Sequence, residues 1–399
     1  MGNDSLVVIE IHPVQYHAPL YCLLQKKFNI PVTVVYGSDF SARGYYDREF
    51  RTFFKWDSDL LSGYTSIFLS RGEKNKIMQF HSIFTSKFEK IFKKTKPKAI
   101  MIVGYNSLFY QLAFHKAHKG GYPIFFRAET IDHARRRNSI KKWLRDQMLT
   151  RMYKTCNKLL HIGKNSFEHF KRHGVDEQKL IFSPYCVDKN IFQYSEESRK
   201  RFRESIRGNL EITKNEVVLL FCGKLSLQKR PDLFLQAVKK LLLTTNKNIS
   251  VIFLGHGKLK SYLEKKGHQN LKIKMHFAGF KNQSQMSPYY HASDLLVMPS
   301  RNETWGLVVN EALQHGLPCV VSESVGCSPD LIEPGITGEK CAANSVVSLT
   351  LAIQRAFVLM ERWDIRKKCR EKVEAYTMEK AAEGIAKAYQ EISKGLTKK

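Results

Sequence analysis

The stretch that decides the fold is "DLLVMPSRNETWGLVVNEALQHGLPCVVSES", residues 294–324. An apolar run at Asp294–Met298 predicts a short buried strand, and helical spacing over 307–315 ends at Gly316. A second apolar run, 318–324, then predicts another strand. The order strand, helix, strand is typical of a parallel sheet in which a helix connects neighbouring strands.

The same alternation extends through both halves of the chain. Strand-like runs lie near 6–11, 32–36, 99–103, 124–127 and 159–162, and again at 216–224, 249–255, 273–279, 294–300 and 318–324. Runs that are apolar on both faces indicate parallel sheets covered by helices on both sides. Because 399 residues are too many for one ordinary core, the sequence predicts an α/β protein with two Rossmann-like domains.

The expected domain limits follow from the polar, charged stretch at 193–214. We place the first domain at residues 1–200 and the second at 201–378. A final helical segment, 379–399, is expected to be able to pack back on the first domain.

Composition narrows the class of protein. An apolar content of 43% and an aromatic content of 12% fit a globular chain. No apolar run reaches the ~18 residues that a membrane span needs, and the start "MGNDSLVVIEIHP" does not fit a signal peptide. The eight cysteines show no C-x-x-C spacing and are expected to be reduced thiols of a cytoplasmic protein.

The net charge of +28 is the compositional outlier. Such a charge predicts an anionic partner, which can be a nucleotide, a nucleic acid or an acidic membrane surface.

Two glutamates, Glu303 and Glu311, bracket the predicted helix start. The first-turn amides of a helix have no intrahelical partner and attract anions, so a phosphate is a natural ligand there. A carboxylate beside those amides would repel a free phosphate unless it binds another part of the same ligand, such as a sugar hydroxyl. At about 1.5 Å rise per residue the two carboxylates are roughly 10 Å apart, comparable to a diphosphate with a sugar at each end.

Cations follow the predicted strand that ends at Cys222. Gly223 lets the backbone turn, and Lys224 and Lys229 come before a predicted helix at Pro231. Two ammonium groups at this position would neutralise a diphosphate and stabilise it as a leaving group. After the next strand, Gly255, His256 and Gly257 permit close approach of the backbone to a ligand or form an ordinary tight turn.

An ordered series of motifs carries a family resemblance. It comprises "FCGKLSLQKRPDLFLQAV" (221–238), "GHGK" (255–258), "FAGF" (277–280) and the stretch 292–338. Together they resemble the C-terminal domain of family 4 glycosyltransferases, which are retaining, nucleotide-sugar-dependent enzymes of the GT-B fold. The resemblance implies two Rossmann-like domains whose parallel sheets face one another across a cleft.

The resemblance also implies roles for individual residues. Glu303 and Glu311 match an E-x7-E motif in which the first carboxylate contacts the donor sugar and the second the ribose. Lys224 and Lys229 match an Arg and a Lys that bind the diphosphate; lysine at the first position keeps the charge and loses the bidentate fork. The amides after Glu303 would hold the phosphates and the sugar, and these belong to Thr304, Trp305, Gly306 and Leu307.

The first half offers acceptor-side candidates. "IHPVQYHAPLYCLL" (11–24) contains His12, Gln15 and His17 and resembles the opening of some bacterial members. These side chains are expected to line the cleft, with a capping or core role as the alternative.

After a later strand, "FFRAETIDHARRR" provides Arg127, Glu129, Asp132 and His133. Family members often place a histidine near this point against the donor sugar. Spacing leaves open whether Arg127, Glu129 or His133 fills that role.

A metal ion is not expected, and no cofactor is expected besides the nucleotide-sugar substrate. Asp57 and Asp59 form a D-x-D pair that lacks the strand context of metal-binding glycosyltransferases, and Cys/His metal spacing is absent.

Two basic helical stretches remain. Residues 133–154 carry Ile140, Trp143, Leu144, Met148 and Met152 at helical intervals among cations. Either these apolar residues pack in the domain, or the helix docks on anionic lipid. Residues 77–94 have the same form and are expected to face the first sheet.

The resemblance therefore predicts a retaining, metal-independent hexosyltransferase. It would use a nucleotide-diphospho-sugar and a glycan or lipid-linked acceptor of surface polysaccharide synthesis, at the cytoplasmic face of a membrane. The alternatives are a nucleotide-sugar epimerase of the same fold and a basic nucleic-acid-binding protein. The last lacks a base-stacking module such as RNP1, and no nucleic acid is expected as a partner.

Overall fold

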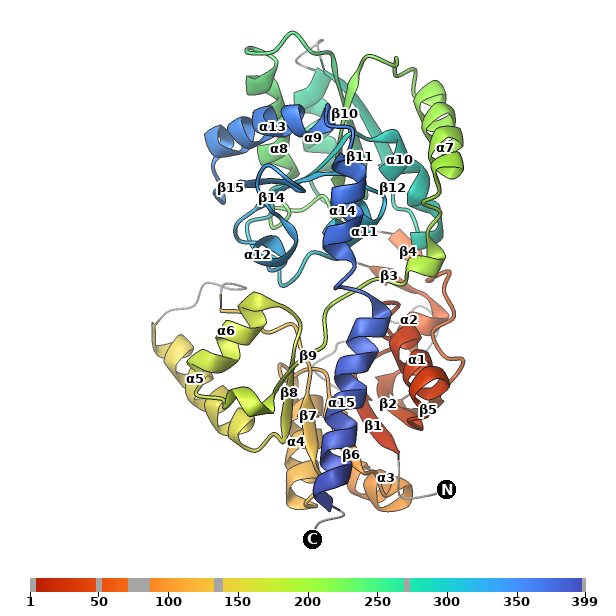
Figure 1. Ribbon diagram of the computed structural model, residues 1–399, viewed down its shortest axis with the longest axis vertical. Coiled ribbons are helices and arrows are strands. Elements are labelled where there is room, and N and C mark those ends of the chain that lie inside the picture. Colours follow the sequence, from red (N-terminus) through yellow and green to blue (C-terminus); the bar gives the residue numbers. More distant parts are fainter. Residues whose placement is uncertain (1–4, 48–51, 71–86, 133–138, 269–272, 397–399) are drawn as a thin grey trace. The chain divides into compact units, whose positions relative to one another are not determined.

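The structure, a computed structural model, describes residues 5–47, 52–70, 87–132, 139–268 and 273–396. The chain forms two compact units (Figure 1). The first comprises residues 1–46, 53–186 and 376–399, and the second comprises residues 47–52 and 187–375. The first unit thus ends at Cys186, before the expected limit at residue 200, and it includes the C-terminal segment.

The described part of the first unit is built on a seven-stranded parallel sheet. The strand order is β5-β2-β1-β6-β7-β8-β9. The strands are β1 (Leu6–Glu10), β2 (Val32–Ser38), β5 (Thr65–Ser70), β6 (Ala99–Ile102), β7 (Ile124–Phe126), β8 (Lys158–His161) and β9 (Leu180–Phe182). The sequence predicted all but β5 and β9. These two are the edges of the sheet, where a strand is not enclosed on every side and its apolar signal is weaker.

Helices cover both faces of this sheet. They are α1 (Ala18–Phe28), α2 (Phe40–Arg43), α3 (Phe88–Thr95), α4 (Leu108–Lys119), α5 (Ser139–Lys154), α6 (Lys164–Arg172) and α15 (Met378–Leu396). One core joins the sheet to α1 and α15, and another joins its opposite face to α3, α4, α5 and α6. Most of the expected helix 77–94 lies outside the described residues, and α3 covers its end.

The C-terminal helix α15 is an integral part of the first unit. Ser183 Oγ donates a hydrogen bond to Ala381 O at 2.9 Å. At Gly384 a Cβ would lie 2.1 Å from Phe182 O, so only glycine allows the helix to pack this closely after β9.

The second unit contains a six-stranded parallel sheet in the order β12-β11-β10-β13-β14-β15. Its strands are β10 (Val217–Cys222), β11 (Ile249–Leu254), β12 (Lys274–Gly279), β13 (Leu295–Met298), β14 (Cys319–Ser322) and β15 (Gly338–Cys341). The sequence missed β15, which is again an edge strand. A short pair, β3 (Tyr45–Asp47) and β4 (Thr52–Phe54), completes the described strands.

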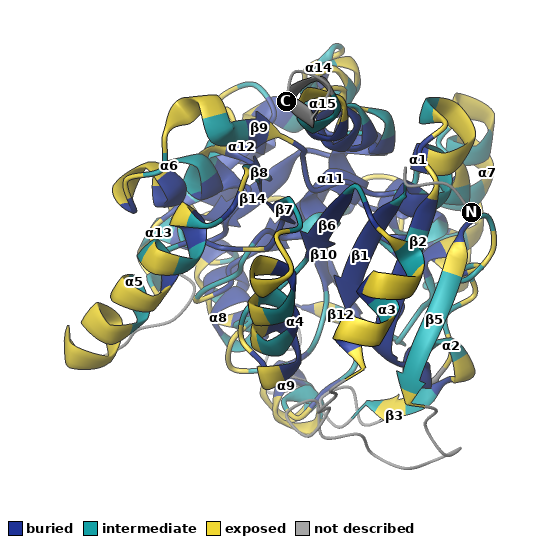
Figure 2. Cartoon of the chain, turned by 90° about the horizontal axis from the view of Figure 1, so that it is seen from below, coloured by how far each residue is buried: buried dark blue, intermediate teal, exposed yellow. Residues whose placement is uncertain are grey.

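Helices also flank the second sheet. They are α7 (Glu196–Asn209), α8 (Pro231–Leu241), α9 (Lys260–His268), α10 (Ser287–Ala292), α11 (Leu307–Gln314), α12 (Ser328–Leu331), α13 (Val346–Met360) and α14 (Ile365–Val373). In Figure 2 the strands of both sheets are mostly dark blue, whereas the helices carry the exposed residues. The prediction of an α/β fold with two parallel sheets is confirmed.

The order of strands in the second unit fixes the place for a ligand. Strand β10 pairs with β11 on one side and with β13 on the other, so the chain changes direction beside β10. In open parallel sheets the crevice beyond the carboxyl ends of such strands is where ligands bind. The segments that follow β10 and β13 are the Gly223–Lys229 loop and the Ser300–Gly306 loop.

Candidate functional site

The Ser300–Gly306 loop leads from β13 into α11. Gly306 is the N-cap of α11, with a φ of 102° and no side-chain cap, so the first-turn amides of the helix are not closed off by a capping side chain. A Cβ on Gly306 would also meet Val325 Cγ1 at 2.9 Å. Glycine therefore allows the turn that presents this helix start.

The segment after β14 holds the loop in shape. Glu303 N donates to Ser324 O (3.3 Å), Gly326 N donates to Glu303 O (3.0 Å) and Cys327 N donates to Trp305 O (2.9 Å). A Cβ on Gly326 would lie only 1.9 Å from Thr304 O. Gly326 is thus a positioning residue for Glu303. Sequence reasoning did not single it out, although it follows a predicted strand, which is the signal that would have drawn notice to it.

Lys229 forms an ion pair with Glu303. The two residues come from different loops, one after β10 and the other after β13. The strand order thus brings together a cation suited to phosphate and a carboxylate suited to sugar hydroxyls at the start of α11. Sequence reasoning assigned both residues to one ligand but did not predict their pairing.

Lys224 lies in the same loop as Lys229. Its Nζ is 3.4 Å from Asp47 Oδ2, which belongs to the same compact unit. Each of the two lysines thus has a carboxylate partner, which compensates its charge.

Glu311 is buried within α11, in contrast to Glu303 near the helix start. Tyr290 of α10 donates a hydrogen bond from its hydroxyl to Glu311 Oε2 at 2.6 Å. Burial, with the neighbouring Cys222 and Glu311, raises the pKa of Tyr290 well above its usual range, so the phenol stays protonated and can donate. Tyr290 is a positioning residue that sequence reasoning missed.

The same hydroxyl reaches strand β10. It lies 3.7 Å from Cys222 Sγ, and burial raises the pKa of that thiol to about 12. Tyr290 therefore connects the end of β10, just before Gly223, to the carboxylate on α11.

The glycines of the two loops beside β10 serve different purposes. Gly223 has a φ of 138° and open space where a Cβ would be. At Gly255 and Gly257 a Cβ would lie 2.0 Å from Gly223 O and 2.6 Å from Leu225 O. These two are required because the loops after β10 and β11 pack against each other.

His256 supports the same arrangement through its backbone. Its carbonyl accepts a hydrogen bond from Leu225 N at 3.0 Å, and its side chain is partly exposed. The two loops are therefore one connected surface at the carboxyl ends of the strands.

In the first unit the predicted His17 lies in a buried chain of polar groups. Its Nδ1 donates to Glu10 Oε1 at 2.5 Å, and its Nε2 lies 2.9 Å from the Tyr185 hydroxyl. Tyr21 donates to Glu10 Oε2 at 3.0 Å. The imidazole of His17 is thus fixed between β1 and the segment after β9.

Gln15 is also buried, and its Oε1 has no hydrogen-bond partner among the residues that the structure describes. His12 is half-buried, with Nδ1 at 3.0 Å from Pro13 O; burial lowers its pKa, so its ring favours the neutral form.

The structure distinguishes the candidates Arg127 and Glu129 after β7 by their exposure. Arg127 is buried; its Nε donates to Ser183 Oγ (3.0 Å) and its Nη2 donates to Pro184 O (2.8 Å). Glu129 is exposed, and its charge adds to burial in raising the pKa of Tyr185. His133 lies outside the described residues. Of the described pair, Glu129 is therefore the side chain accessible to a substrate, whereas Arg127 supports the loop.

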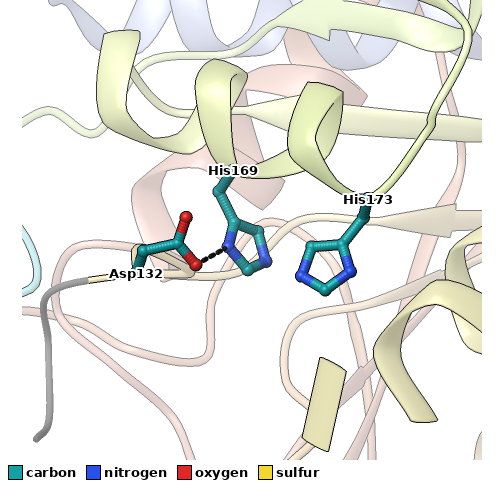
Figure 3. Close-up of side chains that lie close together, drawn as sticks. All are labelled: Asp132, His169 and His173. Atoms are coloured by element: carbon teal, nitrogen blue, oxygen red, sulfur yellow. Dashed lines mark hydrogen bonds and ion pairs between the residues drawn. The ribbon is translucent and has the colours of Figure 1, made fainter. Parts of the chain in front are cut away.

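Among the described residues, one group, Asp132, His169 and His173, has potential metal-ligand atoms within 4.8 Å of one another (Figure 3). Arg172 Nη2 lies 2.5 Å from Asp132 Oδ1 and 3.0 Å from His173 Nε2, where a cation would bind. Burial opposes ionisation of Asp132, but hydrogen bonds from His169 and Arg172 keep its pKa below the usual range. These side chains therefore fit an internal ion pair better than a metal site.

The remaining polar candidates have local roles. Asp59 Oδ1 accepts from Leu61 N (3.0 Å) and Ser62 N (3.1 Å), which is a turn rather than a metal-ligand geometry. All eight cysteines are free thiols, as predicted.

Comparison with known structures defines the class. The structure of Anabaena HepE in complex with UDP-glucose aligns over 99% of this chain and 100% of that one, with a TM-score of 0.66 and 14% identity. This agreement shows the GT-B fold of two parallel-sheet α/β domains.

Sequence comparison gives a family match for part of the chain. A family model described as "Glycosyl transferases group 1" matches residues 202–376, which are less than half of the chain. We therefore assign the likeness to the group 1 glycosyl transferases to this segment alone, which contains the loops after β10 and β13.

Two curated relatives agree with this assignment. An uncharacterized glycosyltransferase of Methanocaldococcus jannaschii is 32% identical over 41% of this chain and 40% of its own length. The lipopolysaccharide 1,2-N-acetylglucosaminetransferase of Salmonella typhimurium is 29% identical over 52% of this chain and 56% of its own length. The matches thus span about half the length of these relatives.

None of the described helices combines the length and the apolar composition needed to cross a membrane.

Proposed function

We propose that this protein is a retaining glycosyltransferase that moves a hexose from a nucleotide-diphospho-sugar to a glycan or lipid-linked acceptor. The observation that carries the proposal is the ion pair between Lys229 and Glu303 beside the start of α11. A cation, a carboxylate and a helix start without a capping side chain at one point suit a ligand with a diphosphate next to a sugar. HepE, which holds UDP-glucose in its solved structure, supports such a donor.

In this mechanism the diphosphate leaves without a metal ion. Lys224 and Lys229 exchange their carboxylate partners for phosphate oxygens and neutralise the charge that develops as the bond to the sugar breaks. Glu303, released from Lys229, accepts hydrogen bonds from the sugar hydroxyls. The amides of Thr304–Leu307 complete the contacts to phosphate and sugar.

Retention needs no protein nucleophile in this scheme. The acceptor hydroxyl attacks on the face from which the diphosphate departs, and a diphosphate oxygen takes its proton. Glu311, oriented by Tyr290, would bind the ribose once the nucleotide is in place. Glu129, the accessible carboxylate after β7, is the first-unit candidate for the transferred sugar.

The acceptor is proposed to belong to surface polysaccharide or glycolipid synthesis. The relative from Salmonella typhimurium is a lipopolysaccharide sugar transferase, which supports this choice. The charge of +28 also favours a location at the anionic, cytoplasmic face of a membrane.

The test is a screen of UDP-, GDP- and ADP-sugars by thermal stabilisation and by donor hydrolysis, followed by transfer assays with lipid-linked acceptors. A product whose anomeric configuration, measured by NMR, equals that of the donor is expected. An inverted product contradicts retention. A changed sugar isomer formed from donor alone identifies an epimerase instead, and tight binding of nucleic acid without nucleotide-sugar turnover favours the non-enzymatic alternative.

A further inference from the structure

Helix α5 exposes large apolar side chains that nothing in the described first unit covers. The exposed fractions are 72% for Ile140, 60% for Trp143, 55% for Leu144 and 42% for Met148. Spacings of three, four and eight residues from Ile140 place them on one side of the helix. In Figure 2, α5 is coloured as exposed over most of its length. The sequence left open whether these residues pack inside the domain, and the structure shows that they do not.

The other side of α5 fastens the helix to the domain. Leu149 and Tyr153 are buried in the core, and the Tyr153 hydroxyl donates to His169 Nε2 at 3.1 Å. Thr150 Oγ1 lies 2.7 Å from His173 Nδ1. The helix therefore presents its apolar side from a fixed base rather than as a loose segment.

The Arg172 network strengthens this attachment. Arg172 Nη1 donates to Asp146 of α5 at 2.9 Å, while its Nε donates to Asp132 at 2.8 Å. Asp146 is the single carboxylate of α5, and this contact compensates its charge. No uncompensated negative charge therefore remains on the helix.

The exposed ionic groups of α5 are all cationic. They are Lys141, Lys142, Arg151 and Lys154. Lysine is depleted from the cores of protein–protein interfaces, so lysines beside exposed aliphatic and tryptophan side chains argue against a protein partner. The same mixture suits a bilayer surface, where apolar side chains enter the acyl boundary and lysine stems reach back to anionic headgroups.

We propose that Ile140, Trp143, Leu144 and Met148 of α5, with the exposed cations Lys141 and Arg151 beside them, dock on a bilayer that contains anionic lipid. The inference rests on the proposed function in one respect, since a lipid-linked acceptor is found at such a surface. It assigns the predicted membrane attraction to one helix. Arg135, Arg136 and Arg137, which precede α5 in the sequence, lie outside the described residues.

The test measures binding of the full chain to vesicles by flotation. Wild-type protein should float with phosphatidylcholine vesicles that contain phosphatidylglycerol, float weakly with pure phosphatidylcholine, and be released at high salt because attraction fades beyond about 8 Å at physiological ionic strength. The triple variant I140S/W143S/L144S and the double variant K141S/R151S should each lose about tenfold or more in affinity. The matched control is W363S/L243S, which removes apolar side chains that are 92% and 85% exposed in the second unit.

Trp143 supplies a second readout. The chain has four tryptophans, and in a Trp363→Phe background Trp143 is the exposed one among them. Its emission should shift to the blue with anionic vesicles and be quenched by brominated lipid. Binding of the triple variant equal to that of wild type, or absence of wild-type flotation, would overturn the proposal, the latter favouring a protein partner.

The outcome is independent of the proposed chemistry. Donor hydrolysis in solution should be unchanged in the α5 variants because none of these residues belongs to the site after β10 and β13. Vesicle binding without nucleotide-sugar turnover would remove the proposed function and leave the docking surface. Turnover without vesicle binding would leave the proposed function and remove the docking surface.

Discussion

The hydroxyl of Tyr290 donates a 2.6 Å hydrogen bond to the buried carboxylate of Glu311 and so joins α10 to α11. The Tyr290 ring also stacks on His315, at 4.8 Å between centroids, and His315 Nδ1 lies 2.7 Å from Glu311 O. The carboxylate that we propose to bind ribose is thus held in a fixed orientation by its neighbours. Preorganisation of this kind improves affinity because less ordering is needed on binding.

Tyr290→Phe should therefore weaken donor binding by about tenfold to 150-fold, in line with roughly 1.5–3 kcal/mol for a hydrogen bond to a charged group. The Michaelis constant for the donor should rise more than kcat falls, since the ribose is remote from the reacting bond. Tyr289→Phe is the matched control, because Tyr289 lies next in sequence and is half-buried, with Lys281 Nζ over its ring. A fall in kcat alone would argue against a positioning role.

Glu303→Gln and Glu311→Gln should each lower turnover by about 10²-fold, or about 2.7 kcal/mol, while the fold is retained. Each glutamine keeps the shape of the glutamate side chain but removes the negative charge that strengthens hydrogen bonds from sugar hydroxyls. Glu323→Gln, an exposed carboxylate after β14, is the control. Steady-state kinetics on proteins with wild-type circular dichroism decides the matter. A folded Glu303→Gln enzyme of full activity is incompatible with the assignment.

Lys224→Ala and Lys229→Ala should weaken binding of the nucleoside diphosphate as well as of the donor, because these ammonium groups meet the phosphates. Lys224→Arg should retain much of the affinity, since it keeps the charge. Titration calorimetry with the diphosphate measures this, with the exposed Lys240→Ala on α8 as control. Equal affinity in both alanine variants and the wild type contradicts the role.

A chelator should leave transferase activity essentially unchanged, because the proposed site supplies lysines and helix amides for the diphosphate. Activity abolished by EDTA and restored by Mn²⁺ would reverse this prediction for the proposed catalytic site.

Arg172→Gln tests the group formed by Asp132, His169 and His173. If this group is an internal ion pair, the variant should lose stability and bind no zinc in equilibrium dialysis.

Stability should fall as the pH drops from about 6.5 toward about 4. Burial lowers the pKa of His173 and of His291 to about 4, whereas an unfolded histidine titrates near 6.5. Between these values the unfolded chain binds protons that the folded chain does not. Each such histidine therefore removes up to about 1.4 kcal/mol of stability per pH unit of acidification.

Urea unfolding at a series of pH values measures this dependence. His173→Gln should flatten it, even though the substitution also lowers stability at neutral pH through lost hydrogen bonds. His118→Gln, on the exposed side of α4, should leave the slope as in wild type. An unchanged slope in His173→Gln would mean that another group governs the acid response.

The first feature that the sequence predicted well is the set of enclosed strands. The strands β10, β11, β13 and β14 are mainly apolar runs, because both faces of a parallel sheet are covered. Of the four edge strands, β12 was predicted, whereas β5, β9 and β15 escaped notice. They are short or mix polar with apolar residues, since one edge of each has no neighbouring strand.

The sequence by itself determined the local features: the helix start at Gly306, the lysines after β10 and the identity of the carboxylates. These are set by residues adjacent in the chain, where turn chemistry and spacing are encoded directly. The tertiary structure alone decided which of them meet. Lys229 reaches Glu303 across 74 positions, Tyr290 reaches Glu311, Arg127 is enclosed, and the apolar side of α5 stays uncovered. The reason is that strand order and helix crossovers set these neighbours, and neither is fixed by any short stretch of sequence.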